Sequence, residues 1–338
     1  MSTGADSTTR PTPPYKPQFT LRSFLARSGT QVGILGVFLA LWLVFILGAP
    51  ETFLSSRIYQ AFMTTVPFFG VIALPLTMLV IAGEMDLSFP SIMAVSFVGF
   101  LFVWNATQIA FLAFAAAIVV GILVGALNGA IVVRLGIPSL VATIGTQFFW
   151  RGASIVLRNG KGQPLLDLRD TFLYQLLVGK TLFGIPNQFF WMLLVGVACW
   201  VVLNRTRLGA HIYLIGDNED SARLMGVNAS RTRMLTFIIV GAAAAFGGVL
   251  ASFQVANFFP SLGEGYLLST LASVFLGGTS VFGGVGTIFG TFLGSYIIGA
   301  IQAAIVAMGL TGFWTELIYG LIIILSVSMH AVLRRRAG

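Results

Sequence analysis

The chain has 338 residues, of which 57% are hydrophobic and only 9% are charged. Soluble domains carry about 25% charged residues, and a soluble protein of this length needs polar side chains over its whole surface. Intrinsic disorder is excluded for the opposite reason, because apolar side chains are abundant. The composition therefore predicts a membrane protein that crosses the bilayer several times.

The N-terminal region is polar and rich in proline over residues 1–20, and mixed in character over residues 21–27. We expect residues 1–30 to form a disordered and interfacial cytoplasmic segment. Residues 32–49 then form an apolar run long enough to cross the hydrocarbon core. No A-x-A cleavage pattern follows this run, so we interpret it as a first span and not as a signal peptide.

Nine further apolar runs predict an all-α bundle of about ten spans, with a transmembrane permease domain over residues 31–333. The runs are 59–82, 91–105, 109–133, 138–157, 188–203, 234–257, 266–280, 287–309 and 313–333. Several are short or broken, since Pro67 and Pro75 interrupt one and Gly277 and Gly278 end another. Broken segments are tolerated in a bilayer only where protein or a water-filled cavity surrounds the freed backbone. They favour a transporter or channel over a simple anchor.

Basic residues are distributed unevenly between the two sides of the predicted bundle. With the N-terminus in the cytoplasm, ten spans place both termini, residues 134–137 and the loop 204–233 on the cytoplasmic side, with 13 of the 19 basic residues. These are Arg10, Lys16, Arg22, Arg27, Arg134, Arg205, Arg207, Arg223, Arg231, Arg233, Arg334, Arg335 and Arg336. The bias matches the positive-inside rule. We therefore interpret the basic tail 334–338 as a cytoplasmic stop signal and not as a nucleic-acid patch.

One short motif occurs twice in the chain. Gly83-Glu84-x-x-Leu87 recurs as Gly263-Glu264-x-x-Leu267, toward the opposite side of the membrane in this topology. An inverted repeat that relates spans two to five with spans seven to ten would produce this pattern. A chance match of three residues is the alternative.

Charged side chains in or beside the spans need a reason, because each costs about 2.5–3.5 kcal/mol at the bilayer centre. Asp86 is placed to accept hydrogen bonds from the first amides of the third span, with direct work on a substrate or ion as the alternative. For Arg151 we expect snorkelling or an internal ion pair, with ligand binding as the alternative. The residues that we assign to structure or gating are Gly83, Glu84, Asp86, Ser88, Arg151, Gly277 and Gly278.

Polar side chains within the apolar runs are candidates for lining a solute pathway: Gln147, Gln254, Asn257, Gln302 and Glu316. No catalytic or metal-binding motif accompanies them. Gly179-Lys180-Thr181 resembles the end of a nucleotide-binding loop, but Tyr174 stands where that motif needs its first glycine. We therefore expect no enzymatic activity, no metal and no cofactor in this chain, and an energy source that is an ion gradient or another subunit.

The loop 204–233 contains a predicted short helix. Asp217 or Asn218 can cap this helix, and Gly226 can end it. Acidic residues in its first turn interact favourably with the helix dipole. Its apolar residues form either a docking surface or one side of a solvated amphipathic loop. The helix and its flanking residues include Gly216, Asp217, Asn218, Glu219, Asp220, Ala222, Arg223, Leu224 and Gly226.

This loop resembles the coupling-helix region of the ribose-type permeases, which are the membrane subunits of bacterial ABC sugar importers. The similarity continues through Gly83–Ser88, 137–152 and 275–286 in the same order, and covers most of residues 60–335. Two positions depart from the family, which usually has glycine where Glu84 and Pro90 stand. These departures leave the subgroup and the solute open.

The resemblance implies a multi-pass permease in the bacterial inner membrane, with both termini in the cytoplasm. Two permease subunits, either two copies or this chain and a close relative, would form the channel for a sugar or polyol. Two cytosolic ATPase subunits would bind ATP and dock on residues 216–226, and an extracytoplasmic solute-binding protein would deliver the solute. Nucleic acid is not an expected partner.

Two other classes of function compete with this reading. An ion-coupled secondary transporter would use Asp86, Glu84 or Glu316 as a proton or cation site. A membrane enzyme is the third possibility, and the lack of a recognisable set of catalytic residues in the sequence argues against it.

Overall fold

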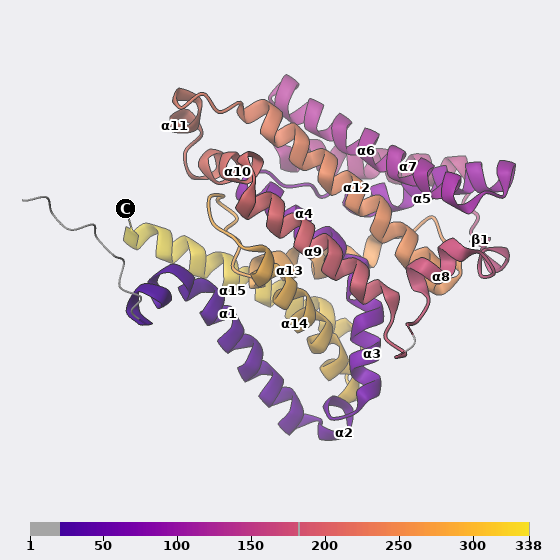
Figure 1. The fold of residues 1–338 in the computed structure, drawn as a ribbon, viewed down its shortest axis with the longest axis horizontal. Helices are drawn as coiled ribbons and strands as arrows, with labels where there is room; N and C mark the ends of the chain where they lie inside the picture. Colours follow the sequence, from indigo (N-terminus) through magenta and orange to yellow (C-terminus); the bar gives the residue numbers. More distant parts are fainter. Residues whose placement is uncertain (1–20, 182, 338) are drawn as a thin grey trace, which may run out of the picture.

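The computed structural model describes residues 21–181 and 183–337. Regular structure in this part of the chain is almost entirely helical, which confirms the predicted all-α, polytopic class (Figure 1). Strands β1 (Gln163–Pro164) and β2 (Asn257–Phe258) form one short antiparallel pair. The tail expected at residues 1–20 lies outside the described residues.

Each of the ten predicted spans coincides with a helix or with two consecutive helices. These are α1 (Leu21–Gly48), α3 (Ser56–Thr65) with α4 (Pro67–Ile81), α5 (Phe89–Thr107), α6 (Ala110–Leu135), α7 (Ser139–Leu157), α9 (Asn187–Arg205), α12 (Ala229–Val255), η2 (Glu264–Tyr266) with α13 (Leu267–Leu276), α14 (Ile288–Ala307) and α15 (Phe313–Ala337). Among the described residues, seven helices are long and apolar enough to cross a membrane, and the bent pair α3–α4 gives an eighth. The segments 264–276 and 313–328 are shorter apolar helices.

The helices at the two chain ends are longer than expected. Helix α1 begins at Leu21, so the interfacial turn predicted over residues 21–27 is continuous with the first span. Helix α15 continues to Ala337, so the predicted tail from 334 onward is helical over most of its length.

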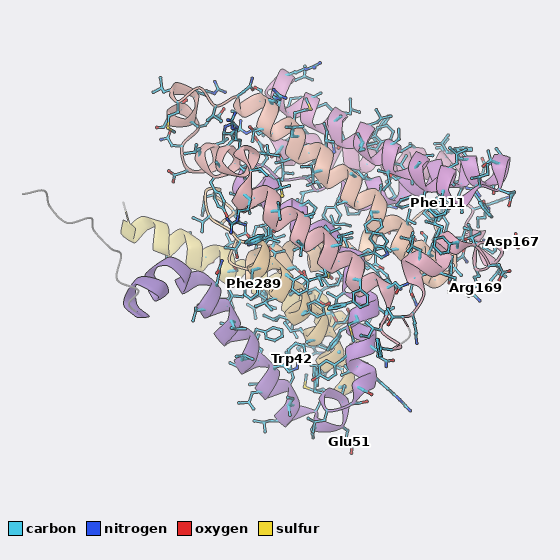
Figure 2. The ribbon with its side chains drawn as sticks, viewed as in Figure 1. Trp42, Glu51, Phe111, Asp167, Arg169 and Phe289 are labelled. Atoms are coloured by element: carbon cyan, nitrogen blue, oxygen red, sulfur yellow. The ribbon has the colours of Figure 1, made fainter. Side chains whose placement is uncertain are left out.

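The connections between helices gather at two ends of the bundle. Helices α10 (Arg207–Asp217) and α11 (Glu219–Leu224) lie at one end, whereas α2 (Pro50–Phe53), η1 (Leu166–Leu168), α8 (Phe172–Val178) and both strands lie toward the other (Figure 1). Glu51 marks the tip of α2, and Asp167 and Arg169 lie beside β1 (Figure 2). Helix α1 stands apart from most of the bundle, and its Trp42 reaches α3 by donating a hydrogen bond from Nε1 to the Tyr59 hydroxyl at 3.1 Å.

Helix α4 forms the centre of the core. All fifteen of its residues are buried, and it packs against α9, α12, α13 and α14. A helix that is apolar on every side needs such complete burial. It meets α3 at a bend of 54°, where Pro67 cannot donate a backbone hydrogen bond into the preceding turn.

Glycine faces allow the closest helix contacts, as expected from their four-residue spacing. Gly121 and Gly125 of α6 lie against Gly241 of α12, and Gly290 and Gly294 of α14 lie against the C-terminal half of α13. A Cβ atom at Gly125 would overlap the carbonyl oxygen of Phe237. These two interfaces therefore depend on the missing side chains.

The two halves of the bundle share an arrangement that supports the predicted inverted repeat. Helix α5 packs against α6 and α7, and α13 packs in the same way against α14 and α15. Gly83, before α5, has φ of +84°, and Gly263, before η2 and α13, has φ of +90°. Both glycines thus adopt the left-handed conformation that other residues rarely take.

The close contact between α6 and α12 can be tested by a substitution that adds a single methyl group. Gly125→Ala should lower the thermal unfolding midpoint of the purified protein, because overpacking against a backbone oxygen costs about 1–3 kcal/mol. Gly145→Ala is the matched control, since no atom lies within 4 Å of a Cβ at that position and alanine favours a helix by up to about 1 kcal/mol. Equal midpoints for the two variants would contradict the close packing.

Candidate functional site

Helix α11 presents an apolar tip at the end of the bundle that α10 occupies (Figure 1). The Asn218 side-chain oxygen accepts a hydrogen bond from the Ser221 amide at 2.8 Å, so Asn218 and not Asp217 caps the helix. Gly226 follows the helix with φ of +81°. Leu224 is 91% exposed and Met225 is 61% exposed, whereas Ala222 is buried in a small apolar cluster with Ile215, Val227 and Ala229. A helix that is anchored on one side exposes its apolar residues on the other.

Two ion pairs of Arg233 connect α11 to the start of α12 and to the residues between α4 and α5, and a third ion pair lies within α11. Glu219 binds Arg223 at 2.6 Å on its own helix and Arg233 of α12, also at 2.6 Å. Arg233 also places Nε 3.0 Å from an oxygen of Glu84. Arg233 therefore bridges the predicted docking helix and the polar segment before α5. It was not among the sequence-based candidates, because its position at the start of a span indicated only membrane orientation.

The two arginines set the charge state of Glu219. Partial burial alone would raise the pKa of the Glu219 carboxyl, but hydrogen bonds and charge from Arg233 and Arg223 outweigh this and hold the pKa below its ordinary value. The interaction is therefore fully present at neutral pH. It is lost only when acidification passes the lowered pKa.

Helix α10 touches both broken regions of the bundle through Gly216. A Cβ atom at Gly216 would overlap the carbonyl oxygen of Ile81, at the end of α4, and the amide of Gly284, in the loop after α13. That amide donates a hydrogen bond to the Ile81 carbonyl at 2.9 Å, and the Tyr213 hydroxyl donates to the Gly286 carbonyl at 2.8 Å. Any displacement of α10 must therefore act on the C-terminal end of α4 and on this loop.

One face of α7 supplies hydrogen-bond acceptors to the segment of residues 83–91, most of which lies outside helix. The bonds run from the Met85 amide to Ser139 Oγ, from the Leu87 amide to Thr143 Oγ1, and from the Ser91 amide to Gln147 Oε1, each at 3.1 Å. The three acceptors are spaced by four residues, which places them on one side of a helix. Gln147, predicted as a pathway residue, thus has a partner in the backbone of α5.

Asp86 lies at the centre of segment 83–91 and is fully buried. One carboxylate oxygen accepts hydrogen bonds from the Ser88 amide at 2.8 Å and from the Ser88 hydroxyl at 2.6 Å, and the other lies 3.3 Å from the Asn128 amide nitrogen. Burial raises the pKa of the Asp86 carboxyl, and the bonds from Ser88 and Asn128 oppose that rise. The geometry is that of an acceptor for the first amides before α5.

Arg151, four residues beyond Gln147 on α7, binds both halves of the bundle. Its guanidinium donates to the carbonyls of Pro90 at 3.1 Å and Leu262 at 2.9 Å, and also to the carbonyl of Pro260. Its Nε lies 3.4 Å from Glu264. Arg151 thus forms an internal ion pair and joins segment 83–91 to the residues before α13.

The remaining candidates occupy separate places. Gln302 and Glu316 line one cavity of about 790 Å³, together with Glu264. Gln254 accepts a hydrogen bond from Gln188 at 2.6 Å, and Asn257 lies in β2 opposite Pro164. The structure therefore brings two of the five pathway candidates together and separates the other three.

The backbone geometry after α13 requires glycine at two positions. A Cβ atom at Gly277 would overlap the backbone of Gly290 and Thr291, and Gly278 has φ of +82°. No cluster of three or more metal-ligating side chains occurs within the described ranges.

Arg233 can be tested as the bridge between α11 and segment 83–91. Arg233→Ala should raise amide hydrogen exchange in both regions about fivefold, because a partly exposed ion pair contributes about 1 kcal/mol. Arg231→Ala, at an exposed position one half-turn away, should leave both regions unchanged. Faster amide exchange confined to α12, or an equal increase in the Arg231→Ala control, would show that Arg233 does not connect α11 to segment 83–91.

Comparison with known proteins places the chain in a family. Residues 58–327 match the family described as "Branched-chain amino acid transport system / permease component". The chain is 30% identical to the ribose import permease protein RbsC of Bacillus subtilis (strain 168) over 87% of this chain and 90% of that protein. It is 29% identical to RbsC of Escherichia coli (strain K12), over 76% and 80% of the two chains. The autoinducer 2 import system permease protein LsrD of Photorhabdus laumondii is 32% identical over 77% and 80%.

These matches extend over most of the helical bundle and confirm the resemblance to the ribose-type permeases of ABC importers. They exclude the reading of the chain as a membrane enzyme, since the relatives are transport permeases. The chain belongs to this family of permease components and is a multi-pass membrane subunit of a transport system.

Proposed function

We propose that the chain forms the solute pathway of a bacterial ABC importer for a sugar or sugar-like solute, in the inner membrane, with both termini in the cytoplasm. The observation that carries this proposal is the contact of the exposed helix α11, through Arg233, with segment 83–91. A secondary transporter has no need for an apolar tip outside the bundle that is tied to its broken span. The relatives named for ribose and autoinducer 2 indicate the solute class.

In this proposal α11 is the docking site for a cytosolic ATPase subunit that binds ATP. The fully exposed Leu224 and its neighbour Met225 would enter a groove of the ATPase, and Asp217, Asp220 and the Arg223–Glu219 pair would form the polar rim of the contact. When two ATPase subunits close on nucleotide, they displace α11 and α10. The displacement reaches segment 83–91 through Arg233 and reaches α4 and the loop after α13 through Gly216.

The structural and gating roles follow from the same contacts. Gly83 and Gly278 provide the left-handed turns at the ends of α4 and α13. Asp86 and Ser88 hold the start of α5, and Gly277 allows α14 to approach. Glu84 and Arg151 are ionic contacts at opposite ends of the unit formed by α7 and segment 83–91, so both are placed to change partners between inward-open and outward-open states.

Two further partners complete the importer. A second copy of the chain, or a close relative, would form the other half of the pathway. A solute-binding protein would deliver the solute at the end formed by α2, α8 and the strands, where the topology places the extracytoplasmic surface.

Transport by the reconstituted importer tests the proposal. The chain, its ATPase subunits and its binding protein in liposomes should accumulate labelled D-ribose or autoinducer 2 only with ATP, and an uncoupler should not abolish the uptake. Uptake by the chain alone that collapses with an uncoupler would instead establish an ion-coupled secondary transporter, for which Asp86, Glu84 and Glu316 are the candidate sites.

The docking site predicts a specific loss of partner binding. Leu224→Asp should prevent co-purification of the ATPase subunits, because a charge at the centre of an apolar contact is left without a partner. Leu54→Asp is the matched control, since Leu54 is 69% exposed and lies in the connection after α2, at the opposite end. Retention of the ATPase by the Leu224 variant would show that α11 is not the docking helix.

A further inference from the structure

A cavity of about 790 Å³ lies within one protomer, between α3, α14, the start of α15 and the residues that lead into α13. Its volume falls in the range of about 300–1,000 Å³ that small-molecule sites occupy. Its lining includes residues of α2 and α3, and these two helices meet at the end of the bundle opposite to α11 (Figure 1). The predicted topology places this end outside the cytoplasm.

The polar lining consists of hydroxyl, amide and carboxylate groups. Thr65, Ser269, Gln302, Thr315, Glu264 and Glu316 are among the lining residues. Hydroxyl and amide groups both donate and accept hydrogen bonds, and ionised carboxylates only accept them. Aromatic rings of α3, α4 and η2 form much of the remaining wall, which suits the apolar face of a small solute.

The charge of the lining is negative. Among the described residues, no Lys, Arg or His contributes to the wall of the cavity. Arg151 compensates Glu264 at 3.4 Å from outside the lining, whereas Glu316 has no ion pair with any described residue. An anionic solute would meet this carboxylate without a cation to balance it.

The negative charge of the lining favours some of the solutes named for the family and its relatives over others: branched-chain amino acids, ribose and autoinducer 2. A carboxylate such as that of a branched-chain amino acid needs an Arg, a Lys or a set of backbone amides, and the lining offers no basic residue. A neutral solute rich in hydroxyl groups can donate to Glu316 and exchange hydrogen bonds with Gln302 and the threonines. The lining therefore favours polyols over amino acids and phosphorylated sugars.

We propose that this cavity is a binding site for an uncharged polyhydroxylated solute, in which Glu316 accepts hydrogen bonds from solute hydroxyls and repels anions. The inference rests on the proposed function for the direction of transport, and every residue that it uses belongs to one chain. If the solute path runs between two protomers, this cavity is an additional binding site beside that path.

Charged thiol reagents test the cavity without transport. Cys199 is buried and is the chain's single cysteine, so Gln302→Cys adds one accessible thiol in the cavity. In the full-length chain in nanodiscs, the ratio of the reaction rates with a cationic and an anionic methanethiosulfonate should be about tenfold higher than the same ratio for a small thiol in solution, because of the nearby carboxylate. The ratio of the two rates does not depend on the thiolate fraction, since both reagents attack the same thiolate.

Adding Glu316→Gln should lower this rate ratio to that of the small thiol in solution, whereas Glu51→Gln, at an exposed acid on α2 outside the cavity lining, should preserve it. D-ribose or ribitol in excess should slow both reagents, and ribose 5-phosphate and leucine should not. Thr315→Cys, in the same lining, serves as the thiol if Gln302→Cys does not fold.

Three results would overturn the proposal. They are a rate ratio at both thiol positions that does not exceed the ratio for the small thiol in solution, a ratio that Glu316→Gln leaves unchanged, and absence of protection by either polyol. Stronger protection by choline than by both polyols would assign the cavity to organic cations instead. Each of these results leaves ATP dependence of uptake untouched, so failure of this site and failure of the proposed importer are distinguishable.

Discussion

The architecture depends on how the bundle satisfies the backbone between α4 and α5. Where the backbone inside an apolar bundle is not helical, each amide group without a hydrogen-bond partner destabilises the fold by several kcal/mol. Here the acceptors are the side chains of Ser139, Thr143 and Gln147, which line one face of α7. Because these bonds are distributed along the helix, α7 and segment 83–91 form one mechanical unit and cannot move separately without exposing buried amides.

Ionic contacts hold this unit at both ends. Arg233 contacts Glu84 near α11, and Arg151 contacts Glu264 at the opposite end. The side chains of Arg233, Glu84 and Arg151 are at most 20% exposed, so breaking either contact leaves a largely buried charge without its partner. A small displacement of α11 can therefore move the unit as a rigid body, which is how packed elements transmit motion between discrete states.

Local rules explain why much of the fold and part of the site were predictable from sequence. Hydropathy located all ten helical segments, and capping preferences located the start of α11 at Asp217 or Asn218 and its end at Gly226, because each of these features is decided within a few residues. Arg233 was missed because its role requires two partners, Glu84 and Glu219, from distant parts of the chain. The partner of Gln147 was not predictable for a related reason, since a polar side chain inside a span can bind solute or backbone, and only the position of α5 shows that the Ser91 amide donates to it.

The two departures from the ribose-type pattern gain a physical meaning from these contacts. Glu84 supplies the ionic partner of Arg233, which a glycine would leave with Glu219 alone. Pro90 stands in the first turn of α5, where its missing amide costs nothing, and its carbonyl accepts from Arg151. Neither residue lines the cavity that holds Gln302 and Glu316. Their substitution therefore concerns how segment 83–91 is held at its two ends.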